Sequence, residues 1–154
     1  MALPLKLLVA SLFSFFLSVS PFAAENVTFK TEKIKIGKKT ITVEIAETEK
    51  QLERGLMHRQ KMKTDAGMFF IFKDEQIRSF WMKNTLIDLS IGYFNKDKKL
   101  IDIQEMSATS IMQKDLPSYP SQGPAMYALE MNKGWFNKNK IAVGAVFSFL
   151  VPRL

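Results

Sequence analysis

The residues best suited to chemistry stand together in one short block of the sequence. The six positions from Phe80 to Thr85 carry an aromatic ring, a cation, an amide and a hydroxyl. Because side chains alternate along a strand, an extended block places Trp81, Lys83 and Thr85 on one face. Such a face is typical of a small-ligand cleft. In the structural alternative, Trp81 packs at a sheet margin, Lys83 snorkels along it and Asn84 caps a turn.

Two further residues complete the predicted binding site. Arg59 follows a short predicted helix, and Glu130 ends an apolar strand. A planar guanidinium and a carboxylate form the strongest directional pair available in the chain, so we expect these two side chains to lie in contact beside Trp81. The predicted ligand-binding residues are therefore Arg59, Trp81, Lys83, Asn84 and Glu130.

The chain lacks the residues that most catalytic mechanisms and cofactor sites require. The chain has no cysteine and a single histidine, His58, which excludes a thiol nucleophile and a thiolate or multi-histidine zinc centre. It also lacks a glycine-rich phosphate loop and a serine in a nucleophile elbow. The sequence therefore predicts no catalytic residue, no metal and no cofactor. The expected function is non-catalytic binding of a small or envelope-associated ligand.

Two alternatives stay open. Asp88, Asp102 and Glu130 could supply the paired carboxylates of a carbohydrate-directed hydrolase, which would stand about 5 to 9.5 Å apart beside Trp81. The methionines could instead bind Cu(I), for which thioethers are suitable soft ligands. They are scattered singly, however, and many occupy apolar strand positions where methionine is an ordinary packing residue.

The dominant period of the apolar residues is two, which predicts strands. Alternation on both sides of Gly37-Lys38 indicates a hairpin, and a second hairpin turns at residues 95–99. Thr48 and Gln51 form a capping-box pattern for a short helix that Gly55 ends, and a second helix is expected from Asn132. Residues 107–124 are predicted to form a long surface loop. We predict an all-β domain with two short helices, folded as a single β-sandwich or barrel-like unit of about seven strands.

The first residues indicate export. Lys6 precedes an apolar run over residues 7–19, and small residues follow at Ala23 and Ala24. This pattern predicts a signal peptide over residues 1–24 and one domain over residues 25–154, in the periplasm or secreted. In the alternative, an uncleaved segment anchors the protein in the inner membrane. The formal charge of +7 favours solubility or attraction to an anionic envelope surface. We expect a monomer that binds no nucleic acid, because the sequence holds no nucleic-acid recognition motif.

The motifs resemble those of one bacterial and archaeal family. Gly55-Leu56-Met57-x-Arg59, Gly67-Met68, the block from Phe80 to Thr85, Leu129-Glu130 and Gly134 are similar to the domain of unknown function 192 family. The resemblance covers about residues 34–151. It implies an all-β sandwich or barrel-like domain with short helices, and it implies no established reaction, cofactor or partner.

The chain departs from the family pattern at two places. Asp88 and Ser90 stand where the family usually has proline and aspartate, and Gly144-Ala145 replaces its Gly-Asp turn. If those acids belong to a ligand site in the family, this chain has altered the site.

The export hypothesis predicts where the mature protein is found and where it begins. Its apolar run is shorter than the roughly 20 residues of a membrane-spanning helix and is interrupted by serines. We expect soluble protein in the envelope fraction, with an N-terminus near Ala24 or Glu25. Intact-mass measurement of that fraction checks this, and membrane-bound protein that retains Met1 would contradict it.

Overall fold

The computed structural model describes residues 26–109, 112–113 and 115–153. The predicted signal peptide lies outside the described residues. The described part contains nine strands and two short helices. In chain order these elements are β1 (Lys30–Ile36), β2 (Lys39–Ala46), α1 (Glu49–Arg54), β3 (Ala66–Gln76), β4 (Ser79–Trp81), β5 (Leu89–Phe94), β6 (Leu100–Met106), β7 (Ser118–Pro120), β8 (Ala125–Asn132), α2 (Trp135–Lys138) and β9 (Phe147–Phe149).

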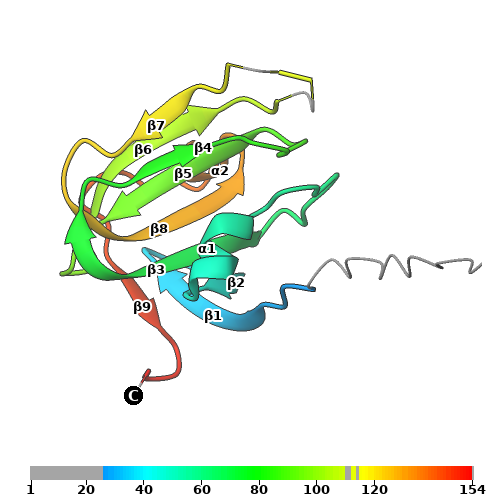
Figure 1. Cartoon of the computed structure of the whole chain (residues 1–154). Helices are drawn as coiled ribbons and strands as arrows, with labels where there is room; N and C mark the ends of the chain where they lie inside the picture. Colours follow the sequence, from blue (N-terminus) through cyan, green and yellow to red (C-terminus); the bar gives the residue numbers. More distant parts are fainter. Residues whose placement is uncertain (1–25, 110–111, 114, 154) are drawn as a thin grey trace, which may run out of the picture.

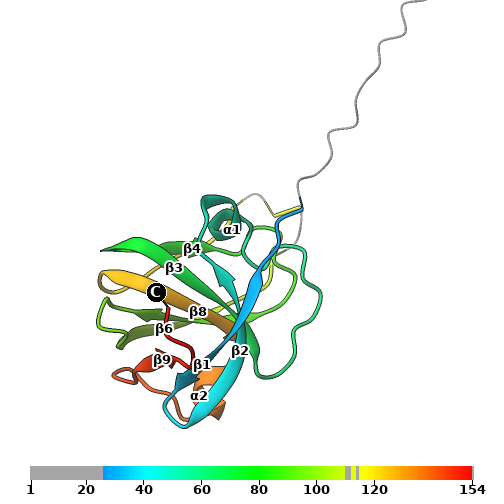
Figure 2. The same ribbon diagram turned by 90° about the horizontal axis from the view of Figure 1, so that it is seen from below.

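Seven of these strands form one sheet in the order β6-β5-β8-β3-β2-β1-β9, and Figures 1 and 2 show that it curls into a half-barrel. Neighbouring strands are antiparallel except β2 and β3, which run parallel. A parallel pair requires a crossover connection, and α1 lies in that crossover. β4 and β7 form a separate two-stranded sheet. The crossover and the small sheet together supply most of the candidate site described below.

The large sheet buries side chains on both of its faces. One core cluster contains Phe69 and Leu129 and is covered by Trp135 and Phe136 of α2. The other contains Met68, Phe70 and Tyr93, with residues of α1, β4 and β7 packed against it, among them Leu52, Phe80 and Tyr119. Because Phe69 faces one cluster while Met68 and Phe70 face the other, β3 reads in the sequence as a continuous apolar run.

The all-β prediction with two short helices is confirmed. Both predicted hairpins exist as β1–β2 and β5–β6. Thr48 and Gln51 form the predicted capping box. The second helix begins at Trp135 rather than Asn132, because Asn132 still pairs with Leu89 as the last residue of β8.

One other segment differs from the sequence expectation. The loop expected over residues 107–124 contains β7, whose three residues pair with β4. The last strand, β9, covers Phe147–Phe149 and pairs with β1. Within the described residues, no helix is long and apolar enough to cross a membrane.

The close approach of β3 and β8 yields a prediction about Gly67. A Cβ added there would lie 2.3 Å from the Met131 sulfur and 2.4 Å from the Glu130 carbonyl oxygen. Because a backbone atom cannot move aside cheaply, we expect Gly67→Ala to lower the free energy of unfolding by about 2 kcal/mol or more. The control is Gly123→Ala, whose Cβ would make an ordinary contact at 3.5 Å. Urea denaturation of both variants checks this, and equal losses would contradict it.

Candidate functional site

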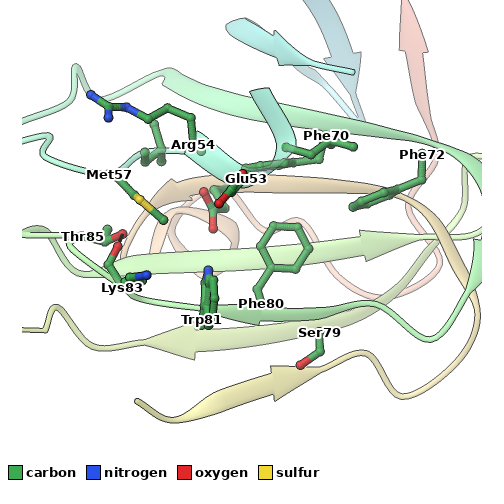
Figure 3. Close-up of a pocket in the computed structure, with 14 residues that line it drawn as sticks. Glu53, Arg54, Met57, Phe70, Phe72, Ser79, Phe80, Trp81, Lys83 and Thr85 are labelled. Carbon is green, nitrogen blue, oxygen red and sulfur yellow. Dashed lines mark hydrogen bonds between the residues drawn. The ribbon is translucent and has the colours of Figure 1, made fainter. Parts of the chain in front are cut away.

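A pocket of about 120 Å³ opens between α1, β3 and β4, and we call it the inner pocket. Figure 3 shows Phe70, Phe72 and Phe80 on one side of it and Met57, Lys83 and Thr85 on the other. Its apolar lining consists of Leu52, Gly55, Leu56, Met57, Phe70, Phe72 and Phe80. Its polar or amphipathic lining consists of Glu53, Arg54, Ser79, Trp81, Lys83, Thr85 and Glu130.

The end of α1 forms one wall of the inner pocket. Gly55 ends the helix with a φ of 45°, a backbone conformation that glycine adopts without strain. The chain then turns tightly, with the Met57 amide donating to the Arg54 carbonyl at 3.2 Å. Gly55 and Leu56 therefore face Phe70 of β3, while Met57 is carried to the rim.

β4 and the turn after it form the opposite wall. The predicted strand through Thr85 is wrong in length, because β4 pairs with β7 only over Ser79–Trp81. The Thr85 amide then donates to the Met82 carbonyl at 3.0 Å, and Thr109 donates both its amide to Thr85 and its hydroxyl to Met82. These bonds fix a turn that buries Thr85 and leaves Lys83 exposed.

Trp81 and Lys83 lie together at the mouth of the pocket. Trp81 is 53% exposed, although it is a large aromatic side chain. The Lys83 ammonium lies 5.4 Å from the centroid of the Trp81 ring, within the range of a cation–π interaction. The pocket mouth therefore presents an aromatic face and a positive charge to solvent.

Glu130 is the most unusual residue of the inner pocket. Its cross-strand neighbours are Met68 on β3 and Ile91 on β5, both fully buried and apolar. Glu130 itself is only 4% exposed, no hydrogen bond or ion pair joins its carboxyl group to another described residue, and its carboxyl oxygens keep contact with solvent at the pocket. Burial raises the pKa of Glu130 from an ordinary value of 4.5 to about 8. The carboxyl group is therefore mostly protonated at neutral pH.

Tyr93 is the titratable neighbour of Glu130 within the sheet. Its hydroxyl donates to the Tyr119 carbonyl at 2.5 Å, which ties β5 to β7. Burial, and to a smaller extent the nearby Glu130 and Asp102 carboxylates, raise the pKa of Tyr93 well above its usual range. Tyr93 therefore stays neutral and serves to hold the small sheet in place.

A second hollow of about 360 Å³ adjoins the inner pocket, and we call it the outer groove. The two share Glu53, Arg54, Met57, Trp81 and Lys83, so they lie side by side. The residues found only in the outer groove are Val27, Lys50, His58 and Asn84. Its charged lining includes three basic side chains at Lys50, Arg54 and Lys83, against one acid at Glu53. The site thus joins a small aromatic pocket to a positively charged groove.

The structure brings together four of the five predicted site residues. Trp81, Lys83 and Glu130 line the inner pocket, and Asn84 lines the outer groove beside Trp81 and Lys83. Asn84 adopts a φ of 53° in the turn, and its carbonyl accepts the His58 amide at 2.7 Å. Asn84 therefore holds the turn as the structural alternative proposed, and it also borders the groove.

The predicted pairing of Arg59 with Glu130 is wrong. The Arg59 guanidinium donates instead to the Glu44 carboxylate at 2.5 Å, and Arg59 lines neither hollow. Glu44 lies on the same face of the sheet as Glu130, because Glu44 pairs with Met68 and Met68 pairs with Glu130. The turn after α1 therefore brings Arg59 to the acid on β2 and not to the acid on β8, two strands away. Since both side chains are partly exposed, this pair contributes about 0 to 1 kcal/mol.

Sequence reasoning missed several residues of the site. Glu53 and Arg54 looked like ordinary solvent-facing residues of a short helix, while Phe70 and Phe80 looked like core residues. The available signal was the glycine after the helix, because Gly55 forces the chain to turn back toward a strand. That signal gives no information on which strand the turn meets.

Two of the three carboxylates of the hydrolase alternative lie away from the inner pocket. Asp88 accepts the Ala108 amide at 2.7 Å, and Asp102 accepts Gln104 Nε2 and the Gln122 amide, so both stabilise loops. Ser90, one of the departures from the family pattern, donates to the Glu105 carboxylate and accepts the Gly134 amide. None of these residues lines the inner pocket.

Metal ligands are also scattered in the part of the chain that the structure describes. No group of three or more histidine, aspartate or glutamate side chains is placed to hold a metal ion there. Met68, Met82, Met106 and Met131 are fully buried in the two core clusters, and Met57 is the methionine of the inner pocket.

Comparisons with known proteins identify an uncharacterised family and two similar solved structures. Residues 31–149 match the DUF192 family, described as "Uncharacterized ACR". The fold resembles a crystal structure from Sinorhizobium meliloti 1021 described as a "putative transcription regulator", with a TM-score of 0.73 and 27% identity over 81% of this chain and 98% of that one. It also resembles a protein of unknown function from Novosphingobium aromaticivorans DSM 12444, with a TM-score of 0.65 and 25% identity over 85% of this chain and 91% of that one. No curated protein matches this chain.

The raised pKa of Glu130 predicts a specific dependence of stability on pH. Below about pH 4.5 the carboxyl is protonated in both the folded and the unfolded chain, so its ionisation takes nothing from the free energy of unfolding. As the pH rises, the unfolded chain loses this proton first, and the folded chain keeps it until about pH 8. The free energy of unfolding should fall by roughly 1.4 kcal/mol per pH unit across that window.

Glu130→Gln should remove this slope and stabilise the protein at neutral pH, because the amide carries no ionisable proton. Asp102→Asn is the matched control, since Asp102 is also 4% exposed but lies outside the inner pocket. Urea denaturation between pH 5.5 and 8.5 measures both variants. An unchanged slope in Glu130→Gln would contradict the prediction.

Proposed function

We propose that this protein, which belongs to the DUF192 family, binds a small molecule in the inner pocket without catalysing a reaction. The observation that carries the proposal is the Glu130 carboxyl, which is buried, lacks a hydrogen-bonding partner among the described residues and lines the pocket. Buried polar groups are almost always hydrogen-bonded, and the Glu130 oxygens remain open to the pocket, so their partner comes from the pocket, as water or as a ligand that replaces it. The aromatic walls supply the apolar contact area that small-ligand sites use.

The dimensions of the site support a two-part ligand. About 120 Å³ is close to the roughly 150 Å³ of an engineered cavity that holds benzene. The inner pocket therefore fits one ring or a short alkyl group, and the remainder of a ligand would extend into the outer groove past Trp81 and Lys83.

We propose that binding takes place outside the cytoplasm, as the N-terminal signal pattern suggests, and that the ligand is envelope-associated or a small solute. Nucleic acid is a less suitable ligand. Helix α1 alternates Glu49 and Glu53 with Lys50 and Arg54, so it does not present the basic face that would engage phosphates. The description of the Sinorhizobium relative as a regulator fits a sensor of small molecules equally well.

One observation favours a hydrolase as the second candidate. Glu53 and Glu130 line the same pocket beside Trp81, and a carboxyl group protonated at neutral pH is what a general acid requires. A panel of aryl glycosides tests this reading: hydrolysis by the wild type that Glu130→Gln abolishes would replace the binding proposal.

The binding proposal predicts that a compound is retained through Trp81. Protein isolated from its native host is denatured, and the released small molecules are identified by mass spectrometry. We expect Trp81→Ala to retain at least tenfold less of the compound than the wild type, because the mouth of the pocket loses its aromatic wall. Ile77→Ala is the control, since Ile77 is equally exposed at 55% but lines neither hollow. Equal retention by both variants, or none by the wild type, would contradict the proposal.

A further inference from the structure

The interior of the inner pocket is suited to positive charge. Its walls carry the rings of Phe70, Phe72, Phe80 and Trp81, and aromatic ring faces attract cations. Two of these rings already attract a cation of the protein, since Arg78 lies over Phe72 at 4.1 Å and Lys83 lies 5.4 Å from the Trp81 centroid. Its two deeply buried polar residues are Glu130 and Thr85, and the Glu130 carboxyl can accept hydrogen bonds and carry a negative charge. The buried hydroxyl of Thr85 is already engaged, since it donates to the Lys83 carbonyl at 3.3 Å.

Among the described residues, the inner pocket offers an anion no buried cation to pair with. The backbone amides of Gly55 and Met57 already donate to carbonyls of α1, and the cations Lys83 and Arg54 stand at its mouth. Figure 3 shows that the Arg54 guanidinium points away from the phenylalanine side chains. An anionic group would therefore be stabilised in the outer groove and not in the inner pocket.

We propose that the ligand carries an organic ammonium group, which enters the inner pocket and pairs with Glu130, and an anionic group, which lies in the outer groove near Lys83. This inference deepens the proposed function and depends on it. The ligand class is a zwitterion with its amine and its anion separated by a short chain, so that each end meets the opposite charge. The aromatic side chains replace the hydration shell that the ammonium loses.

Ionisation of Glu130 is coupled to this binding. The empty pocket holds the carboxyl mostly protonated, whereas an ammonium group favours the carboxylate, so binding at neutral pH releases a proton. The other ionisable groups around Glu130 are Tyr93 on β5, Glu53 and Arg54 on α1, and Lys83 after β4. Glu44 of β2 lies on the same face of the sheet beyond Met68 and is paired with Arg59. Tyr93 stays neutral throughout this range, because burial raises its pKa. An ammonium ligand should therefore bind more tightly as the pH rises.

The first experiment compares three probes of equal chain length on the full wild-type protein: n-butylamine, butyramide and butyrate. Trp81 lines the pocket and is exposed, whereas the other tryptophan, Trp135, is buried and lines neither hollow, so a change of fluorescence on ligand binding reports on Trp81. We expect only n-butylamine to saturate the signal, with an affinity that rises about tenfold between pH 6.5 and pH 7.5 and levels off above pH 8.

The second experiment uses variants. Glu130→Gln should weaken n-butylamine at least tenfold and remove its pH dependence, whereas the control Asp102→Asn should leave both unchanged. Lys83→Ala should weaken 5-aminopentanoate about fivefold relative to n-butylamine, because only the zwitterion reaches the outer groove. Lys83 is exposed, so this variant retains the fold.

The outcomes separate this inference from the proposed function. Tighter binding of butyrate at low pH would show that protonated Glu130 donates to an anion, and binding of butyramide at all pH values would show a neutral ligand. Either result, or failure of n-butylamine to bind, overturns the ammonium assignment. A compound retained through Trp81 in the native protein would still support ligand binding in each case. Loss of that retention would remove the proposed function as well.

Discussion

The pairing of β3 with β8 is the constraint on which the rest of the site depends. Gly67 opposes Met131 and Met68 opposes Glu130, and this register requires a residue without a Cβ where β3 meets the Glu130 carbonyl. Since side chains alternate along a strand, the register places Glu130 on the same face as Met68 and Phe70. A slip of one residue would turn Glu130 to the opposite face, into the cluster of Phe69 and Leu129, and the inner pocket would lose its acid.

The sequence predicted the features that arise from neighbouring residues. Alternation of apolar side chains located both hairpins, and the Thr48–Gln51 pattern located α1, because strand pairing through a tight turn and helix capping depend on residues close in sequence. The block after Phe80 and the acid at Glu130 were predicted as site residues because each combines a polar group with an apolar setting, and the structure places Trp81, Lys83 and Glu130 at one pocket.

The failed predictions all concern contacts between distant segments. The length of β4 is set by β7 and by Thr109, about 40 and 30 residues further along the chain, so the sequence around Lys83 predicted a strand where the structure has a turn. Arg59 was assigned to Glu130 because the two form the best pair by chemistry. The crossover that contains α1 instead carries Arg59 to Glu44 on β2. The same crossover brings Glu53, Arg54 and Met57 to the pocket. Such pairings follow from the topology of the sheet, which periodicity alone does not specify.

Glu130 also explains how stability and binding are related in this fold. A carboxyl group buried without a partner lowers the stability of the folded protein as soon as the unfolded chain can ionise, so an amide or an apolar side chain would serve the core better. A cation in the inner pocket reverses this penalty, because it makes the ionised form of Glu130 favourable in the folded state. Binding of a cation would therefore restore the free energy of unfolding that the buried carboxyl group costs the empty protein. A neutral molecule of the same shape would not restore it. If the inner pocket binds an ammonium group as proposed, discrimination by charge follows from the burial of the acid itself, and the aromatic walls add contact area.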